Sequence, residues 1–122
     1  MITEDYVSFE TAKLLKEKRF EVSCMGRYSV RSKEFHLDCT RLCSNSGLFE
    51  CAAPSQAMAM KWLREVHNII ISIAPQRDKY YFTPWQLWDS EWVHTKAMLS
   101  LYNSYEEAVE AAIKYSLKNL IK

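Results

Sequence analysis

The spacing of apolar residues divides the chain into three helical patterns separated by segments of apolar–polar alternation. Apolar residues recur every three or four positions, as on one face of an amphipathic helix, in three segments: 9–18, 56–67 and 105–121. A serine that can cap the helix precedes each segment: Ser8, Ser55 and Ser104. Glu107 stands three residues after the last serine, which is the pattern of a capping box. We expect all three segments to be helices.

Short segments between the helices follow the two-residue period of strands, and turn residues separate them. The expected strands are 28–31, 35–39, 48–52, 69–73, 79–87 and 92–95. Pro84 falls within one of them, and because proline has no backbone N–H, it predicts an edge or bulged strand there. The short turns favour antiparallel hairpins.

This order, α-β-β-(β)-α-β-β-(β)-α, predicts an α+β two-layer sandwich with three helices on one face of a mostly antiparallel sheet. The length of 122 residues suits a single domain, 1–122. The side of the second helix that covers the sheet should carry Ala59, Trp62, Leu63 and Val66. Small residues such as Ala108 and Ala112 should let the last helix lie close to the strands.

Composition excludes several classes of protein. The acidic N-terminus does not resemble a secretory signal, and the longest apolar stretch, 66–74, is too short to cross a bilayer. We therefore expect a cytoplasmic protein without membrane association, whose thiols stay reduced. Only two glycines occur, and no glycine-rich phosphate loop or hydrolase motif is present. A nucleotide-driven enzyme is not expected, nor is a cofactor.

The cysteines form one cluster that could hold zinc. Four cysteines and one histidine lie within 28 residues of each other: Cys24, His36, Cys39, Cys43 and Cys51. Thiolate and imidazole are the usual ligands of tetrahedral zinc, but the ligands normally come in close pairs, and only Cys39 and Cys43 approach that spacing. We favour buried, reduced thiols over a metal site. A reactive pair of Cys51 with His67 or His94 is the other chemical interpretation.

An aromatic run in the second half of the chain is the main candidate for a binding surface. The residues proposed for interaction are Tyr81, Trp85, Trp88 and Trp92. Such rings can stack on bases or sugars, but they also fill the buried side of a sheet, and we favour packing. Rings that are exposed would point to a protein partner.

A mild excess of positive charge lies in residues 11–43, where eight basic and four acidic side chains give a net charge of +4. Nucleic-acid binding depends on a clustered basic surface that tracks phosphates. The excess is too small for this, so a nucleic-acid partner is not favoured and remains an alternative.

Three passages together resemble small proteins of gut Bacteroidetes genomes, prophages and mobile elements, a group with no established activity. The passages are Val7-Ser-Phe-Glu-Thr-Ala-Lys-Leu-Leu-Lys-Glu-Lys, Ala53-Pro-Ser-Gln-Ala-Met-Ala-Met-Lys-Trp-Leu-Arg-Glu-Val-His-Asn and Ser104-Tyr-Glu-Glu-Ala-Val-Glu-Ala-Ala-Ile-Lys-Tyr. Arg19 departs from the pattern, because these proteins tend to place a helix-ending glycine there. The resemblance implies that the protein belongs to a phage or mobile element, but it implies no activity and no functional residues.

The first functional hypothesis is therefore a non-enzymatic accessory protein of a phage or mobile element that acts through protein contacts. Its partner is an unknown protein, with a homodimer among the options. The alternatives are a nucleic-acid-binding protein that uses residues 11–43 and a small zinc- or thiol-dependent enzyme.

Overall fold

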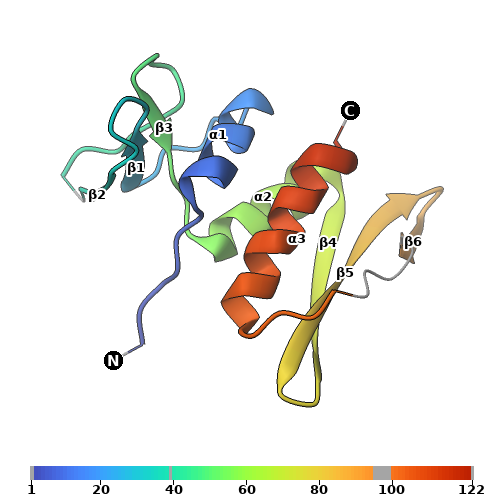
Figure 1. Ribbon diagram of the computed structural model, residues 1–122. Helices are drawn as coiled ribbons and strands as arrows, with labels where there is room; N and C mark the ends of the chain where they lie inside the picture. Colours follow the sequence, from blue (N-terminus) through green and yellow to red (C-terminus); the bar gives the residue numbers. More distant parts are fainter. Residues whose placement is uncertain (1, 39, 95–99, 122) are drawn as a thin grey trace. The chain divides into compact units, whose positions relative to one another are not determined.

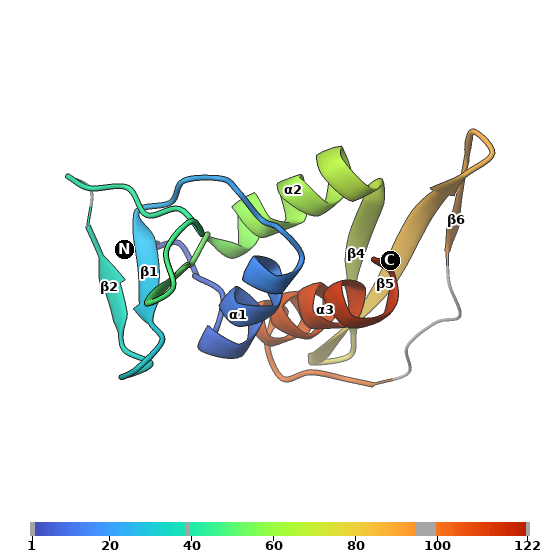
Figure 2. The ribbon, with the colours of Figure 1, turned by 90° about the horizontal axis from the view of Figure 1, so that it is seen from above.

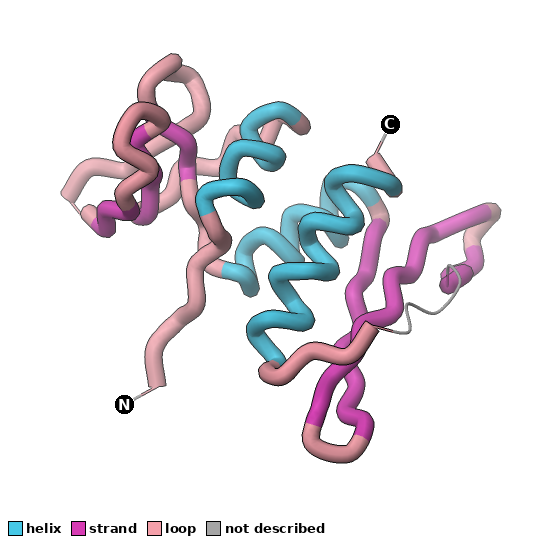
Figure 3. Tube along the Cα trace, viewed as in Figure 1, coloured by secondary structure: helices cyan, strands magenta, loops and turns pink. Residues whose placement is uncertain are grey.

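The computed structural model describes residues 2–38, 40–94 and 100–121 (Figure 1). Helices and strands follow one another in the predicted order (Figure 3). Their bounds are α1 Phe9–Glu17, β1 Gly26–Ser29, β2 Phe35–Leu37, β3 Glu50–Ala52, α2 Gln56–His67, β4 Ile69–Gln76, β5 Lys79–Trp88, β6 Glu91–His94 and α3 Tyr105–Asn119. All described strand pairs are antiparallel, so the predicted α+β class is confirmed.

The strands form two three-stranded sheets rather than the one common sheet expected. One sheet has the order β2-β1-β3 and the other has the order β4-β5-β6. Each strand thus pairs only within its own group of three, and α2 separates the two groups in the sequence. Periodicity identifies a strand from its own residues, but it carries no information on pairing across an intervening helix.

The chain divides into two compact units, residues 1–58 and 59–122. Each unit has its own sheet, and each is described separately below. The single domain 1–122 therefore stays a prediction.

In the first unit, side-chain hydrogen bonds hold α1 and the loops to the sheet β2-β1-β3. The Ser8 hydroxyl accepts from the Thr11 N–H and caps α1 as predicted. The Tyr28 hydroxyl, on β1, donates to the carbonyl oxygen of Val7 at 2.7 Å. The Asn45 side chain donates to the carbonyl of Phe20 and accepts from the N–H of Ala52, which ties the chain after α1 to β3.

Helix α1 ends in a left-handed residue, Arg19, with φ 64°. The N–H of Arg19 donates to the carbonyl of Lys16, and the N–H of Phe20 donates to that of Leu15. This pair of bonds is a Schellman motif, whose left-handed position favours glycine. Arg19 therefore occupies the position at which the resemblance leads one to expect glycine.

In the second unit, β5 is the central strand of the sheet and α3 packs against β4 and β5. The prediction that Pro84 marks an edge or bulged strand is wrong. Pro84 pairs with Ile71 of β4, while the described pairing with β6 begins at Trp85.

The serine hydroxyls predicted to cap α2 and α3 do so, but one hydrogen bond of the predicted capping box has a different donor. The Ser104 hydroxyl accepts from the N–H of Glu107 at 3.1 Å, whereas the Glu107 carboxylate accepts from the N–H of Asn103 rather than from that of Ser104. In α2, the Ser55 hydroxyl accepts from the N–H of Met58.

The buried side of α2 is shorter than predicted. Ala59, Trp62 and Leu63 are buried, but Val66 in the last turn is 57% exposed. The ring of His67, instead of Val66, packs edge-on against Trp62 with ring centres 4.7 Å apart.

A two-residue turn joins β5 to β6. Asp89 and Ser90 both have positive φ, 50° and 67°, and Trp88 pairs with Glu91 directly before and after them. Two consecutive left-handed residues are characteristic of a type I′ turn, whose twist matches that of the hairpin strands. The turn thereby fixes the register of β6 against β5.

Candidate functional site

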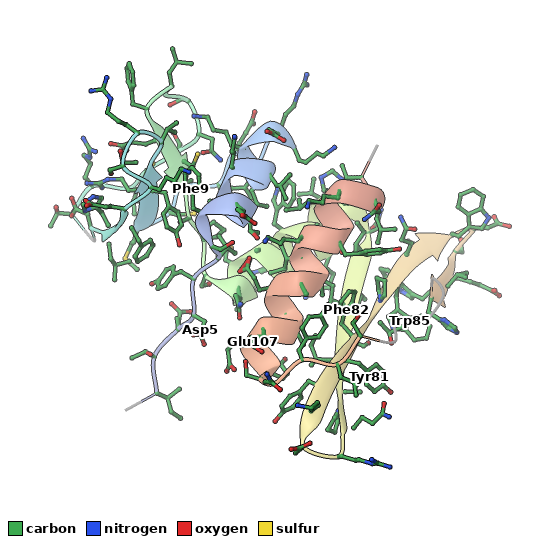
Figure 4. The ribbon with its side chains drawn as sticks, in the orientation of Figure 1. Asp5, Phe9, Tyr81, Phe82, Trp85 and Glu107 are labelled. Atoms are coloured by element: carbon green, nitrogen blue, oxygen red, sulfur yellow. The ribbon has the colours of Figure 1, made fainter. Side chains whose placement is uncertain are left out.

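The side chains of β5 alternate between the two faces of its sheet. Phe82 and Pro84 are buried on the face that α3 covers, and the rings of Phe82 and Tyr115 of α3 are 5.9 Å apart. Further along the same face, the Gln86 side-chain amide donates to the carbonyl of Leu120. Figure 4 shows Phe82 on the α3 side of the strand, and in Figures 1 and 2 both α2 and α3 lie on this side of the sheet.

No described helix of the second unit covers the other face of this sheet, which carries aromatic and aliphatic side chains. We call the part of it from Tyr81 to Leu87 of β5, together with the residues opposite on β4 and β6, the open face. It consists of Ile70, Ser72, Ala74, Tyr81, Thr83, Trp85, Leu87, Trp92 and His94. Tyr81 and Trp85 are half-buried, whereas Leu87 and Trp92 are 40% and 41% exposed. None of these nine residues is Asp, Glu, Lys or Arg. Lys79 follows the same alternation at the end of β5, and its ammonium group donates to the Asn103 side chain.

Contacts across the strands fix the centre of the open face. The indole N–H of Trp85 donates to the Ser72 hydroxyl of β4 at 3.0 Å. On the other side, the Trp85 ring packs edge-on against His94 of β6, with ring centres 4.9 Å apart. Leu87 lies directly opposite Trp92. Because its central ring is held in place, the face presents a preformed surface.

The structure brings together three of the four proposed interaction residues. Tyr81, Trp85 and Trp92 lie on the open face, and Trp88 lies on the opposite face near the end of the hairpin, where it is 74% exposed. The run supplies rings to both faces of the sheet, and a role of these residues in binding stays a prediction. Sequence reasoning missed Ile70, Leu87 and His94. The separation of three residues between Trp85 and Trp88 was the available signal, since residues an odd number apart on a strand point to opposite faces.

The cysteine cluster does not gather around one point. Cys24 and Cys43 face each other across an isolated antiparallel bridge, while Cys51 on β3 pairs with Tyr28. His36 is exposed on β2, 3.9 Å from the Glu34 carboxylate. Cys39 lies outside the described residues. Within the described part of the chain, no three or more His, Cys, Asp or Glu side chains are grouped as a metal site would require.

The described thiols are protonated at neutral pH. Burial raises the pKa of Cys24 to about 11, and it also raises the pKa of Cys43 and that of Cys51. A thiol is nucleophilic as its thiolate, and groups that lower its pKa activate it. The surroundings of these cysteines act in the opposite direction, which does not favour thiol catalysis.

Several basic groups of residues 11–43 are already engaged within the first unit. Arg27 lies 3.8 Å from Asp38 and 3.6 Å from Glu50, and Arg41 lies 3.2 Å from Glu50. The Lys16 ammonium donates to the carbonyl of Glu50, and that of Lys33 lies over the Phe9 ring. The ion pairs of Arg27 and Arg41 offset part of the positive charge that a phosphate would meet.

Comparison with protein-family models, curated proteins and solved structures gave no match for this chain. Across residues 2–38, 40–94 and 100–121, no helix has both the length and the apolar character needed to span a membrane.

Proposed function

We propose that this protein is a non-enzymatic interaction protein that forms a homodimer through the open face of β4-β5-β6. The observation that carries the proposal is the open face itself, an ordered aromatic surface without Asp, Glu, Lys or Arg. Its role as an accessory protein of a phage or mobile element rests on the sequence resemblance alone.

The absence of Asp, Glu, Lys and Arg from the face favours a second copy as the partner. In a two-fold symmetric contact, each surface meets itself, so a charged patch would bring like charges together. Within the open face there is no such repulsion to overcome, and Lys79, which continues the same side of the sheet at the end of β5, donates to the Asn103 side chain. Pairing Trp92 and Leu87 of one copy with the same residues of another would also remove exposed apolar surface from water.

The open face can form the centre of an interface rather than the whole of it. From Tyr81 to Leu87, β5 extends for about 23 Å, and three strands span about 14 Å, which gives less than the area that each partner contributes to a specific interface. The core of a specific interface is typically rich in Trp and Tyr and poor in charged side chains, and Tyr81, Trp85 and Trp92 supply that composition.

The test is the molar mass of the full chain in solution, measured by size-exclusion chromatography with light scattering over a range of concentrations. The wild type should approach twice the monomer mass of 14.4 kDa as concentration rises. Trp92→Lys should stay monomeric, because it places two like charges in the symmetric contact. Trp88→Lys is the matched control: it removes a more exposed tryptophan from the opposite face and should leave the dimer intact.

Far-UV circular dichroism confirms that each variant is folded. A wild type that is monomeric at every concentration overturns the proposal, as does a dimer that Trp88→Lys disrupts and Trp92→Lys does not. Salt should not weaken the association, since no ion pair is expected in it.

Nucleic-acid binding through residues 11–43 is the alternative, and the internal contacts of Arg27 and Arg41 do not favour it. Titration of labelled single-stranded and duplex DNA at low salt tests it. Binding that weakens steeply as salt rises would support this alternative.

A further inference from the structure

Cys24 and Cys43 are held opposite each other by two backbone hydrogen bonds. The N–H of Cys24 donates to the carbonyl of Cys43 at 2.8 Å, and the N–H of Cys43 donates to the carbonyl of Cys24 at 2.7 Å. In an antiparallel pair of this kind, the Cα atoms are about 5.5 Å apart and both side chains point to the same side. A disulfide requires Cα atoms separated by about 4.4 to 6.8 Å, which this pair meets, and Cβ atoms about 3.5 to 4.5 Å apart, which is closer than in a hydrogen-bonded pair. The two segments must therefore approach slightly for the bond to form, and the resulting strain favours a bond that is readily reduced.

We infer that Cys24 and Cys43 are a reversible disulfide site, which the protein closes by thiol–disulfide exchange with a small-molecule disulfide. The bond would join the segment that follows α1 to the segment that precedes β3, and it would enclose β1 and β2 in a covalent loop. The inference concerns the first unit alone and does not depend on the open face.

Cys43 is the thiol expected to react first. Both thiols line surface hollows, Cys43 one of about 350 Å³ and Cys24 a smaller one of about 210 Å³. Burial and the Glu50 carboxylate raise the pKa of Cys43, and the guanidinium groups of Arg27 and Arg41 offset part of this effect. Burial, and to a smaller extent Cys43, raises the pKa of Cys24 to about 11, and no cation among the described residues lowers it.

The exchange proceeds in two balanced steps with glutathione disulfide as the oxidant. The Cys43 thiolate attacks one sulfur of glutathione disulfide, forms a mixed disulfide and releases one glutathione thiolate, which takes up a proton. The Cys24 thiolate then attacks the Cys43 sulfur and releases the second glutathione. Two protein thiols are oxidised, and two glutathione thiols are formed. Excess reduced glutathione reverses both steps.

The experiment uses the folded full chain, equilibrated at about pH 8.5 with glutathione disulfide and then treated with a thiol-alkylating reagent, because the thiolate is the reacting form. Trypsin places Cys24 in peptide 20–27, Cys39 in peptide 34–41 and Cys43 with Cys51 in peptide 42–61. Chymotryptic cleavage after Phe49 then separates Cys43 from Cys51. Mass spectrometry identifies the linked peptides.

The expected product is a cross-link between Cys24 and Cys43, with the protein lighter by two hydrogen atoms. It should persist in Cys39→Ser and Cys51→Ser, be absent from Cys43→Ser and disappear on addition of reduced glutathione. A predominant cross-link to Cys39 or Cys51, a mixed disulfide that never resolves, or thiols that all remain free at equilibrium would each overturn the inference. Circular dichroism before and after oxidation ensures that the bond forms in the folded protein.

Discussion

The indole N–H of Trp85 donates a hydrogen bond to the hydroxyl of Ser72 across the β4–β5 pair, at 3.0 Å. This bond holds the central ring of the open face in one orientation. Ser72→Ala should therefore lower the free energy of unfolding by about 0.5–1.5 kcal/mol, the usual net value of one hydrogen bond. Urea unfolding followed by circular dichroism measures the change. Ser72→Thr keeps the hydroxyl and should recover most of the loss; equal destabilisation by both variants would show that the hydrogen bond is not responsible.

Substitution by alanine should destabilise the protein at Gly26 and have almost no effect on its stability at Gly47. A Cβ atom at Gly26 would lie 2.5 Å from the carbonyl oxygen of Ala53 and 2.9 Å from the Phe35 ring, whereas at Gly47 it would meet nothing within 4 Å. Gly26→Ala should cost roughly 1–3 kcal/mol of stability, because backbone or ring must shift. Gly47→Ala should change it by less than about 0.5 kcal/mol. Thermal unfolding of both variants tests this pair, and a similar Tm for the two would contradict the packing around β1.

Arg19 offers a site at which a substitution should stabilise the protein. Its φ of 64° places a residue with a Cβ in the left-handed region at the end of α1. Arg19→Gly should raise the free energy of unfolding by roughly 0.5–1 kcal/mol, because glycine adopts this conformation without steric cost. Arg19→Ala removes the same side chain but keeps the Cβ, so it should give no gain. Urea unfolding of the two variants measures their free energies of unfolding, and an equal gain in both would contradict the prediction.

His67 should make the protein less stable in mild acid. Burial lowers its pKa, and its Nε2 atom is buried without a hydrogen-bond partner among the described residues. The unfolded chain therefore binds a proton more readily than the folded protein does. The stability should be complete above the ordinary histidine pKa of about 6.5 and should fall as the pH drops below it.

Urea unfolding of the wild type and of His67→Gln at several pH values between about 7.5 and 5 measures this contribution, since histidine is the side chain that ordinarily titrates there. The glutamine variant should lose less stability on acidification than the wild type. The exposed His36 supplies the control, because His36→Gln should retain the wild-type decline. An unchanged pH dependence in His67→Gln would exclude His67 as its cause.

Helix positions were predictable from the sequence because both of their determinants are local. The serine caps and the apolar stripes placed α1 and α2 to within one residue and α3 to within two. Strand identity was also local, and β6 was correctly anticipated although its pattern is weak. The exposure of Val66 and the position of Pro84 in a central strand were not predictable, because they depend on which elements lie beside them.

The open face was not predictable from the sequence either, because it depends on which elements cover each side of β5. The sequence indicated an aromatic run but not the element that covers each side of its strand. Only the pairing of β5 with β4 and β6, together with α3 on one side, separates Tyr81, Trp85 and Trp92 from Phe82 and Trp88. The opposed pair of Cys24 and Cys43 likewise arises from a bridge between two segments that do not form regular strands.

The length of the type I′ turn at Asp89 and Ser90 determines which residues of β6 lie on each face of the sheet. Since side chains alternate along a strand, the number of residues between Leu87 and Trp92 decides which side of the sheet the tryptophan joins. A single inserted residue that shifted the pairing by one would transfer Trp92 to the α3 side and bring Glu91 or Val93 into its place, according to the direction of the shift, with the composition of the hairpin almost unchanged. In related chains, insertions and deletions in this turn would thus alter the surface more than most point substitutions on it.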